Sequence, residues 1–421
     1  MIVSTISSNL EIAALLVILL LLSGRIFFHN LLSKNYTLNW FLVSLFGLPL
    51  LVIPLKSSYE FLNYRFVASA SNADVILILT QITLGFLNLI RYTGFARKKG
   101  NSFPTLNLFS GIPLASACLA LIYALTTGQG WLQPVYCILI FGIGAFLRFD
   151  YRELKISLLL SLNLGIIGQI LSIVIGNNVS QCRADKCIIF SSILNVDSAG
   201  NGFGVRILLL TLPLLMIANR AEKPSVLLIS FSLILLSGSR TALITLFTTF
   251  LLYVFIIRVQ LVPRHSKISL VSGLVVALTV LPVFREFDQR FLTLRGDLWA
   301  RGRALLSESP FIGHGPSYWV RLNGQDSFFA NYGAHNLWMD SGIAFGIIGT
   351  LILSTWLIVG YREMRIRSDY FVISLLGLVL SASVESTLTF WTFGFAIPLL
   401  IILVSAEDER NEMSSSFAEG K

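Results

Sequence analysis

A polar segment from about residue 285 to 335 interrupts an otherwise apolar chain and is rich in arginine. Guanidinium groups hold phosphate and diphosphate by charged, paired hydrogen bonds, so several of them together suit such a ligand. Arg295 and Arg303, with Trp299 between them, are the first candidates. A surface helix whose acidic residues pair with these arginines would explain part of the same pattern. Both interpretations stay open.

Two of the four histidines lie in this polar segment. Histidine titrates near neutral pH and can take a proton from an attacking hydroxyl group. His335, which is followed by Asn336 directly before an apolar run, is the candidate for such a base. His314 lies between glycines and is better explained by a turn. A histidine that is merely solvated is the alternative for both.

Two further charged residues lie where charge costs free energy in an apolar chain. Arg240 follows Ser237-Gly238-Ser239 between two apolar runs, and Glu385 lies inside an apolar run near the C-terminus. A charge in such a place pairs with an opposite charge, reaches the membrane surface, or serves a function. Arg240 could be a snorkelling residue in a tight turn, and Glu385 could pair with an arginine such as Arg206. Both are also functional candidates.

Cys182 and Cys187 flank a short polar connection and could form a disulfide if that connection lies on the outer side of the membrane. No cysteine or histidine group has the spacing of a metal site, so neither a metal nor another cofactor is expected. The phosphate-binding loop of ATPases, the dinucleotide-binding fingerprint and the serine hydrolase elbow are missing as well. Any chemistry must therefore use a substrate that is already activated.

Apolar helices in a membrane must position these residues. Hydrophobic residues make up 55% of the 421-residue chain and charged residues only 13%, against about 25% charged in soluble proteins. Apolar runs that could cross a hydrocarbon core of about 30 Å recur along nearly the whole chain. We predict an all-α polytopic membrane protein with about 12 (11–13) transmembrane helices. They lie near residues 9–24, 38–55, 75–90, 107–128, 134–149, 156–176, 203–219, 225–238, 241–257, 268–284, 336–360, 370–390 and 391–405.

The formal net charge of +9 is spread over the connections between these runs, which does not favour nucleic-acid binding. Alternate connections are basic and should face the cytoplasm. They contain Arg25, Arg97, Arg152, Arg220, Arg264 and Arg362. By this alternation, the segment 285–335 is a long outer loop, and residues 406–421 form a polar cytoplasmic tail.

Taken in order along the chain, these features resemble the family of O-antigen ligases and polymerases. The resemblance rests on Ser-Gly-Ser before Arg240, Arg295-x-x-x-Trp299, Pro310-Phe311-Ile312-Gly313-x-Gly315, and His335-Asn336 followed by Gly342 and Gly346. Each element is weak alone, but their order and spacing between about residues 200 and 360 are more specific. The resemblance implies a catalytic region, 201–405, that follows N-terminal helices in 1–200.

Members of this family take a glycan from undecaprenyl diphosphate and transfer it to an acceptor hydroxyl, without a metal or a nucleotide sugar. The acceptor is a lipid A core for a ligase and a growing glycan for a polymerase, and the residues do not separate the two. The resemblance places the reaction at the periplasmic face of a bacterial inner membrane. It implies that His335 activates the acceptor hydroxyl and that Arg240 and Arg295 hold the diphosphate. Weaker candidates for binding the diphosphate are Arg206, Arg290, Arg301 and Arg303. Candidates for supporting the site are Asn336, Glu385 and Trp299.

A transporter or flippase for polysaccharide precursors is the rival from another functional class. It would place charged residues along the spans to line a path, and the sequence offers mainly Arg206 and Glu385. The charge gathers at one face instead. A non-enzymatic assembly factor would need none of these residues. We therefore expect a transferase of lipid-linked glycans.

Overall fold

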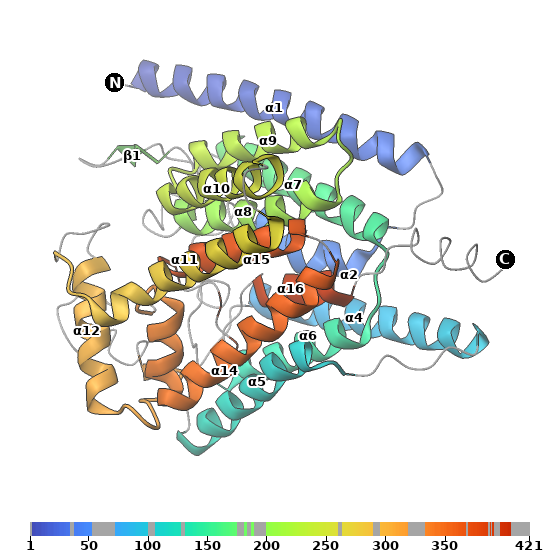
Figure 1. Ribbon diagram of the computed structural model, residues 1–421. Helices are drawn as coiled ribbons and strands as arrows, with labels where there is room; N and C mark the ends of the chain where they lie inside the picture. Colours follow the sequence, from blue (N-terminus) through green and yellow to red (C-terminus); the bar gives the residue numbers. More distant parts are fainter. Residues whose placement is uncertain are drawn as a thin grey trace.

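The computed structural model describes the chain over residues 2–33, 38–52, 72–99, 106–127, 131–174, 181–182, 187–188, 199–259, 263–288, 295–318, 333–367, 369–385, 388, 390 and 396–405. Within these ranges the strands are β1 (Gln181–Cys182) and β2 (Cys187–Ile188), which pair antiparallel as a small hairpin. All other regular structure in the described ranges is helical (Figure 1). Apart from the hairpin, the predicted all-α fold is confirmed there.

Among the described residues, seven helices are long and apolar enough to cross a membrane. They are α1 (Ile2–Ser33), α4 (Asn72–Lys99), α5 (Leu108–Thr127), α7 (Tyr151–Val174), α10 (Arg240–Tyr253), α11 (Arg264–Phe284) and α14 (Leu337–Arg367). Helix α10 runs on directly into a short π-helix, η3 (Val254–Arg258). The chain is therefore a multi-pass membrane protein.

The other apolar helices have shorter apolar stretches. They are α2 (Trp40–Leu42) with η1 (Val43–Gly47) and α3 (Leu48–Val52), then α6 (Leu132–Phe146), α8 (Ala199–Ile217), α9 (Lys223–Leu236), α15 (Asp369–Ala382) and α16 (Ala396–Ser405). Helices thus stand where spans were predicted, while the number of about 12 crossings stays a prediction. In the described part of the segment 285–335, the helix is the polar α12 (Arg295–Glu308).

The last two predicted spans, 370–390 and 391–405, have different boundaries in the structure. Helix α15 ends at Ala382, and α16 begins only at Ala396. The hydropathy pattern extended the predicted span 370–390 through Glu385, because the residues around Glu385 are mostly apolar. The backbone instead leaves the helix in a final turn, in which the N–H of Glu385 donates to the carbonyl of Ser381 at 3.0 Å.

Helix α7 is the most buried of the seven long helices, since 67% of its most apolar stretch is buried inside the protein. It packs against α1, α3 and α8. Small residues let the neighbouring backbones approach it closely, as is usual where helices pack inside a membrane. A Cβ atom on Gly168 would lie only 2.6 Å from the carbonyl oxygen of Leu51, and Gly47 lies directly against Ser161.

Helix α14 is broken in its middle, and residues 310–315, which we call the 310–315 loop, fill the break. Phe345 and Gly346 have non-helical backbone angles there. Backbone groups freed inside a membrane protein must find partners within the protein. The loop supplies them through three hydrogen bonds, from Ile347 N to Pro310 O (2.8 Å), from His314 N to Ile343 O (2.7 Å) and from Gly315 N to Ala344 O (3.0 Å). The Pro-Phe-Ile-Gly-His-Gly sequence therefore has a structural task.

Glycine is needed on both sides of this contact. Gly346 has a φ of 62° and Gly313 a φ of 77°, and glycine adopts such angles without steric cost. A Cβ atom on Gly313 would lie 2.6 Å from the nitrogen of Gly346, and one on Gly346 would overlap the carbonyl group of Phe311. This close contact fixes the first half of α14, which begins two residues after His335.

Replacing Gly346 by Ala is expected to destabilise the folded chain by at least about 1–3 kcal/mol, because the positive φ becomes strained and the added methyl group overlaps Phe311. Thermal unfolding of the detergent-purified protein measures the effect. Gly273→Ala is the matched control, since a Cβ atom there has no neighbour within 4 Å. Equal unfolding temperatures for the two variants would contradict a stabilising contact between Gly346 and the 310–315 loop.

Candidate active site

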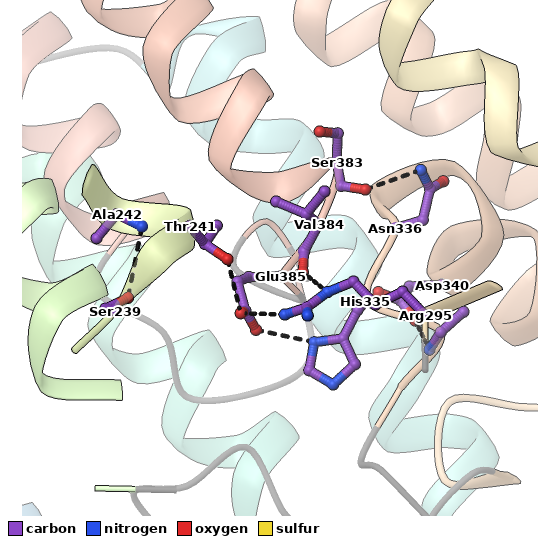
Figure 2. A network of polar contacts seen from close by, with 11 residues as sticks. Ser239, Thr241, Ala242, Arg295, His335, Asn336, Asp340, Ser383, Val384 and Glu385 are labelled. Carbon is purple, nitrogen blue, oxygen red and sulfur yellow. Dashed lines mark hydrogen bonds and ion pairs between the residues drawn. The ribbon is translucent and has the colours of Figure 1, made fainter. Parts of the chain in front are cut away.

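Glu385 joins three separate parts of the chain at one point (Figure 2). It lies in the turn after α15, and one carboxylate oxygen, Oε2, is 2.9 Å from Nδ1 of His335. The other, Oε1, forms an ion pair with Arg295 and accepts a hydrogen bond from the hydroxyl of Thr241 at 3.3 Å. Because Arg295 begins α12, His335 precedes α14 and Thr241 lies in the first turn of α10, the carboxylate ties these elements together.

His335 is held in a strained backbone conformation. Its φ is 52°, and it is the single non-glycine residue in the described ranges with a positive φ. Such strain persists where the surroundings enforce it, and it is concentrated at functional sites. On the preceding side, the N–H of Ala334 donates to a carboxylate oxygen of Asp340 at 2.7 Å. The segment that carries the imidazole is therefore fixed from within α14.

Asn336 fixes the following side. Its side-chain oxygen accepts hydrogen bonds from the N–H groups of Trp338 and Met339 at 3.1 and 3.2 Å, which caps α14. Its amide nitrogen donates to the carbonyl oxygens of Thr279 in α11 (2.9 Å) and Ser383 (3.2 Å). Asn336 thus positions the turn next to His335 against the segment that bears Glu385.

The Glu385 carboxylate determines which imidazole nitrogen carries a hydrogen. Burial raises the pKa of this carboxyl, but the charge of Arg295 and the contact with His335 outweigh burial and lower that pKa to about 2. Glu385 is therefore ionised at neutral pH and accepts the Nδ1–H of His335. This hydrogen bond assigns the tautomer in which Nε2 keeps its lone pair.

The Nε2 atom of His335 is the chemically important end of the ring. It is buried and has no hydrogen-bond partner among the described residues, and Figure 2 shows it pointing away from Glu385. A buried polar atom without a partner costs free energy and calls for an explanation. The hydrogen bond at Nδ1 orients the ring, and Nε2 has no hydrogen bond of its own in the described part of the chain. Such a basic nitrogen can take a proton from a bound hydroxyl group.

Arg295 is closely bound by its neighbours. Its Nε donates to the carbonyl oxygen of Val384 at 2.6 Å, in addition to the ion pair with Glu385. One turn along α12, Trp299 is buried and packs edge-to-face on Phe287, with ring centroids 5.2 Å apart. The aromatic contact anchors the helix that presents Arg295, so Trp299 supports the site from a distance.

Arg240 begins α10 immediately after a tight turn that its sequence explains. Ser237 ends α9, Gly238 has a φ of 64°, and Ser239 caps α10 by accepting the N–H of Ala242. Arg240 itself is exposed and lies beside Thr241, which contacts Glu385. A cation in the first turn of a helix lies against the positive end of the helix dipole, which favours an anion nearby.

The other predicted arginines have different surroundings. Arg303 donates from one nitrogen to the carbonyl oxygens of Pro282 and Arg285, both at 2.9 Å, and so caps the end of α11. Arg206 is buried in α8, and Glu385 pairs with Arg295 rather than with Arg206. Arg301 lies 3.6 Å from Asp297 within α12, and Arg290 lies outside the described residues.

Two positioning residues, Thr241 and Asp340, were not singled out from the sequence. Thr241 adjoins Arg240, and Asp340 is a carboxylate inside an apolar run, which is the same signal that pointed to Glu385. The hairpin backbone places Cys182 opposite Cys187, but their side chains lie outside the described residues, so the disulfide stays a prediction. Within the described ranges, no three His, Cys, Asp or Glu side chains are grouped so that they could hold a metal ion.

Residues 225–354 match the model of a protein family described as O-antigen ligase. The resemblance to that family is confirmed. The matched region contains Arg240, Arg295, His335 and the 310–315 loop, whereas Glu385 lies beyond its end. The search of curated proteins found no match for the chain.

Nitrogen NMR of the histidine-labelled protein is expected to show His335 at neutral pH with a hydrogen on Nδ1 and none on Nε2, because ionised Glu385 accepts the Nδ1–H. His335→Ala identifies the signal among the four histidines. In Glu385→Leu, which leaves no side-chain acceptor beside Nδ1, the preference for the Nδ1–H form should be lost. A wild-type signal with its hydrogen on Nε2 would contradict the assigned geometry.

Proposed function

We propose that this chain is an O-antigen ligase-type glycosyltransferase that moves a glycan from undecaprenyl diphosphate to an acceptor hydroxyl. The carrying observation is the His335 imidazole, which Glu385 orients from behind and which presents an unsatisfied Nε2. The match to the O-antigen ligase family over residues 225–354 supports the same reaction class. The region 201–405 holds this machinery in the proposal, and the N-terminal helices in 1–200 serve as its scaffold.

In the proposed reaction, Nε2 of His335 takes the proton of the acceptor hydroxyl while the acceptor oxygen attacks the anomeric carbon of the donor sugar. The bond between that carbon and the diphosphate oxygen breaks, and the electron pair leaves with the diphosphate. The imidazolium that forms is stabilised by the carboxylate of Glu385, 2.9 Å from Nδ1. The base contributes to the rate because the attacking oxygen must lose its proton as the bond forms.

The departing diphosphate gains negative charge, which fixed cations stabilise. Arg240 is the best placed for this task, because it is exposed at the N-terminus of α10 beside the Glu385 contact of Thr241. Arg295 faces the same point, although Glu385 and Val384 already bind its guanidinium. We therefore assign Arg295 mainly to orienting Glu385, and diphosphate binding mainly to Arg240. Arg206 and Arg303 are secondary contributors in this proposal.

The ends of three helices support a site on the outer face of the inner membrane. Helices α10 and α14 begin at the site, and α11 approaches it near its end, where Thr279 binds Asn336. At their other ends, these helices carry Arg258, Arg264 and Arg367. Basic helix ends favour the cytoplasm, so the opposite ends, with the site, would face the periplasm.

His335→Ala is expected to reduce glycan transfer by about a hundredfold or more, because the general base is lost. The test uses a strain that depends on this chain for its surface glycan, with electrophoresis of the glycan and extraction of lipid-linked intermediates. Lipid-linked chains should accumulate in the variant at normal protein levels in the membrane. His29→Ala, which alters an exposed histidine in α1, is the matched control and should behave as wild type.

Unchanged surface glycan in His335→Ala, with normal insertion, would contradict the catalytic role. The same gel separates the two acceptors. Loss of all lipid A-linked bands indicates a ligase, whereas survival of a band with a single repeat unit indicates a polymerase, in which the growing glycan is the acceptor.

A further inference from the structure

An apolar cavity lies toward the ends of α10 and α15 that point away from the site. It has a volume of about 300 Å³ and lies between α8, α9, α10 and α15, which Figure 1 shows side by side. Leu212, Leu227, Phe250 and Ile373 each contribute to its wall from one of these helices. This volume is at the lower end of the range for ligand pockets. Because its lining is almost wholly apolar, the cavity suits a hydrocarbon rather than water.

The cavity and Glu385 lie at different positions along α10 and α15, and no described residue of the site lines the cavity. Along α10, Thr241 contacts Glu385, while Tyr253 lines the cavity. Tyr253 is twelve positions from Thr241, about 18 Å along a helix, and Leu246, the lining residue of α10 nearest to Thr241, is five positions from it, about 8 Å. Along α15, the cavity adjoins Tyr370 near the first turn, whereas Glu385 follows the last. The cavity is therefore not part of the proposed catalytic site.

The end of the cavity that lies farthest from Glu385 is lined by basic and aromatic residues. The ammonium group of Lys223 lies 4.8 Å from the centre of the Tyr370 ring, and the rings of Tyr370 and Tyr253 are 5.8 Å apart. Arg258 and Arg264 are close enough to interact electrostatically with Tyr370. Tyrosine and basic residues at helix ends are typical of the headgroup level of a membrane.

The acidic residues near this end leave the positive charge in excess. The cations at this end are Lys223, Arg258 and Arg264. The carboxylate of Asp369 is paired with Arg264 and offsets its charge. Glu222 adjoins Lys223 in sequence but is bound instead by Lys155 at 3.2 Å and by the amide of Asn30 at 2.8 Å. Lys223 and the exposed Arg258 thus remain to attract an anionic group.

We propose that this cavity binds an anionic glycerophospholipid. One acyl chain occupies the apolar space between α8, α9, α10 and α15, and the phosphate of the headgroup lies against Lys223. The charge at the rim and the apolar lining behind it match the two parts of such a lipid. The site is separate from the transferase reaction and does not depend on it.

Native mass spectrometry of the full chain, purified in detergent and offered equal amounts of phosphatidylglycerol and phosphatidylethanolamine, tests the proposal. Wild type should retain phosphatidylglycerol in preference. Lys223→Gln should weaken this retention about fivefold, the effect of one basic residue at a charged surface. Leu227→Trp, which fills the cavity, should remove it.

Matched controls lie next to these positions. Arg220→Gln removes an exposed cation in the same turn, and Leu228→Trp adds the same bulk to a side chain that is 54% exposed and does not line the cavity. Both should bind phosphatidylglycerol as wild type does. Equal retention by Leu227→Trp and Leu228→Trp, or retention without headgroup preference, would overturn the proposal. So would a polyprenyl phosphate found in place of the phospholipid.

Discussion

The contact between the Glu385 carboxylate and the His335 imidazole is the interaction on which the arrangement of the candidate site depends. A carboxylate with only 12% of its side chain exposed is costly unless charged and polar partners surround it. Arg295, His335 and Thr241 supply those partners from three different elements. The need to satisfy one buried charge therefore brings α10, α12 and the start of α14 together.

The surrounding structure keeps that contact rigid. Asn336 and Asp340 hold the backbone on both sides of His335, and the 310–315 loop fills the break in α14. Each of these devices uses backbone hydrogen bonds, which are strong where water is excluded. A base must be held within about 0.5 Å of its productive position, so this rigidity serves the proposed reaction.

Much of the fold could be predicted because helices in a membrane follow hydropathy, and charged residues in apolar runs mark candidate sites. Arg240 and Glu385 were singled out in this way, whereas Arg295 and His335 were singled out by their residue types within the polar segment 285–335. The pairing of Glu385 could not be predicted, because its partners lie 50 and 90 residues away and Arg206 was an equally charged alternative. The end of α15 was missed for the same reason, since hydropathy does not report where a carboxylate finds its partners. The break in α14 depends on tertiary contact with the 310–315 loop, which no local pattern contains.

In the proposed mechanism Glu385 acts through His335, and a double-mutant cycle on the glycan-transfer rate tests this relation most directly. The four proteins are wild type, Glu385→Gln, His335→Ala and the double variant, compared at equal membrane levels. If Glu385 only orients and charges the imidazole, the double variant should be no slower than His335→Ala alone. Losses that multiply in the double variant would show that the two residues act independently and would contradict the account.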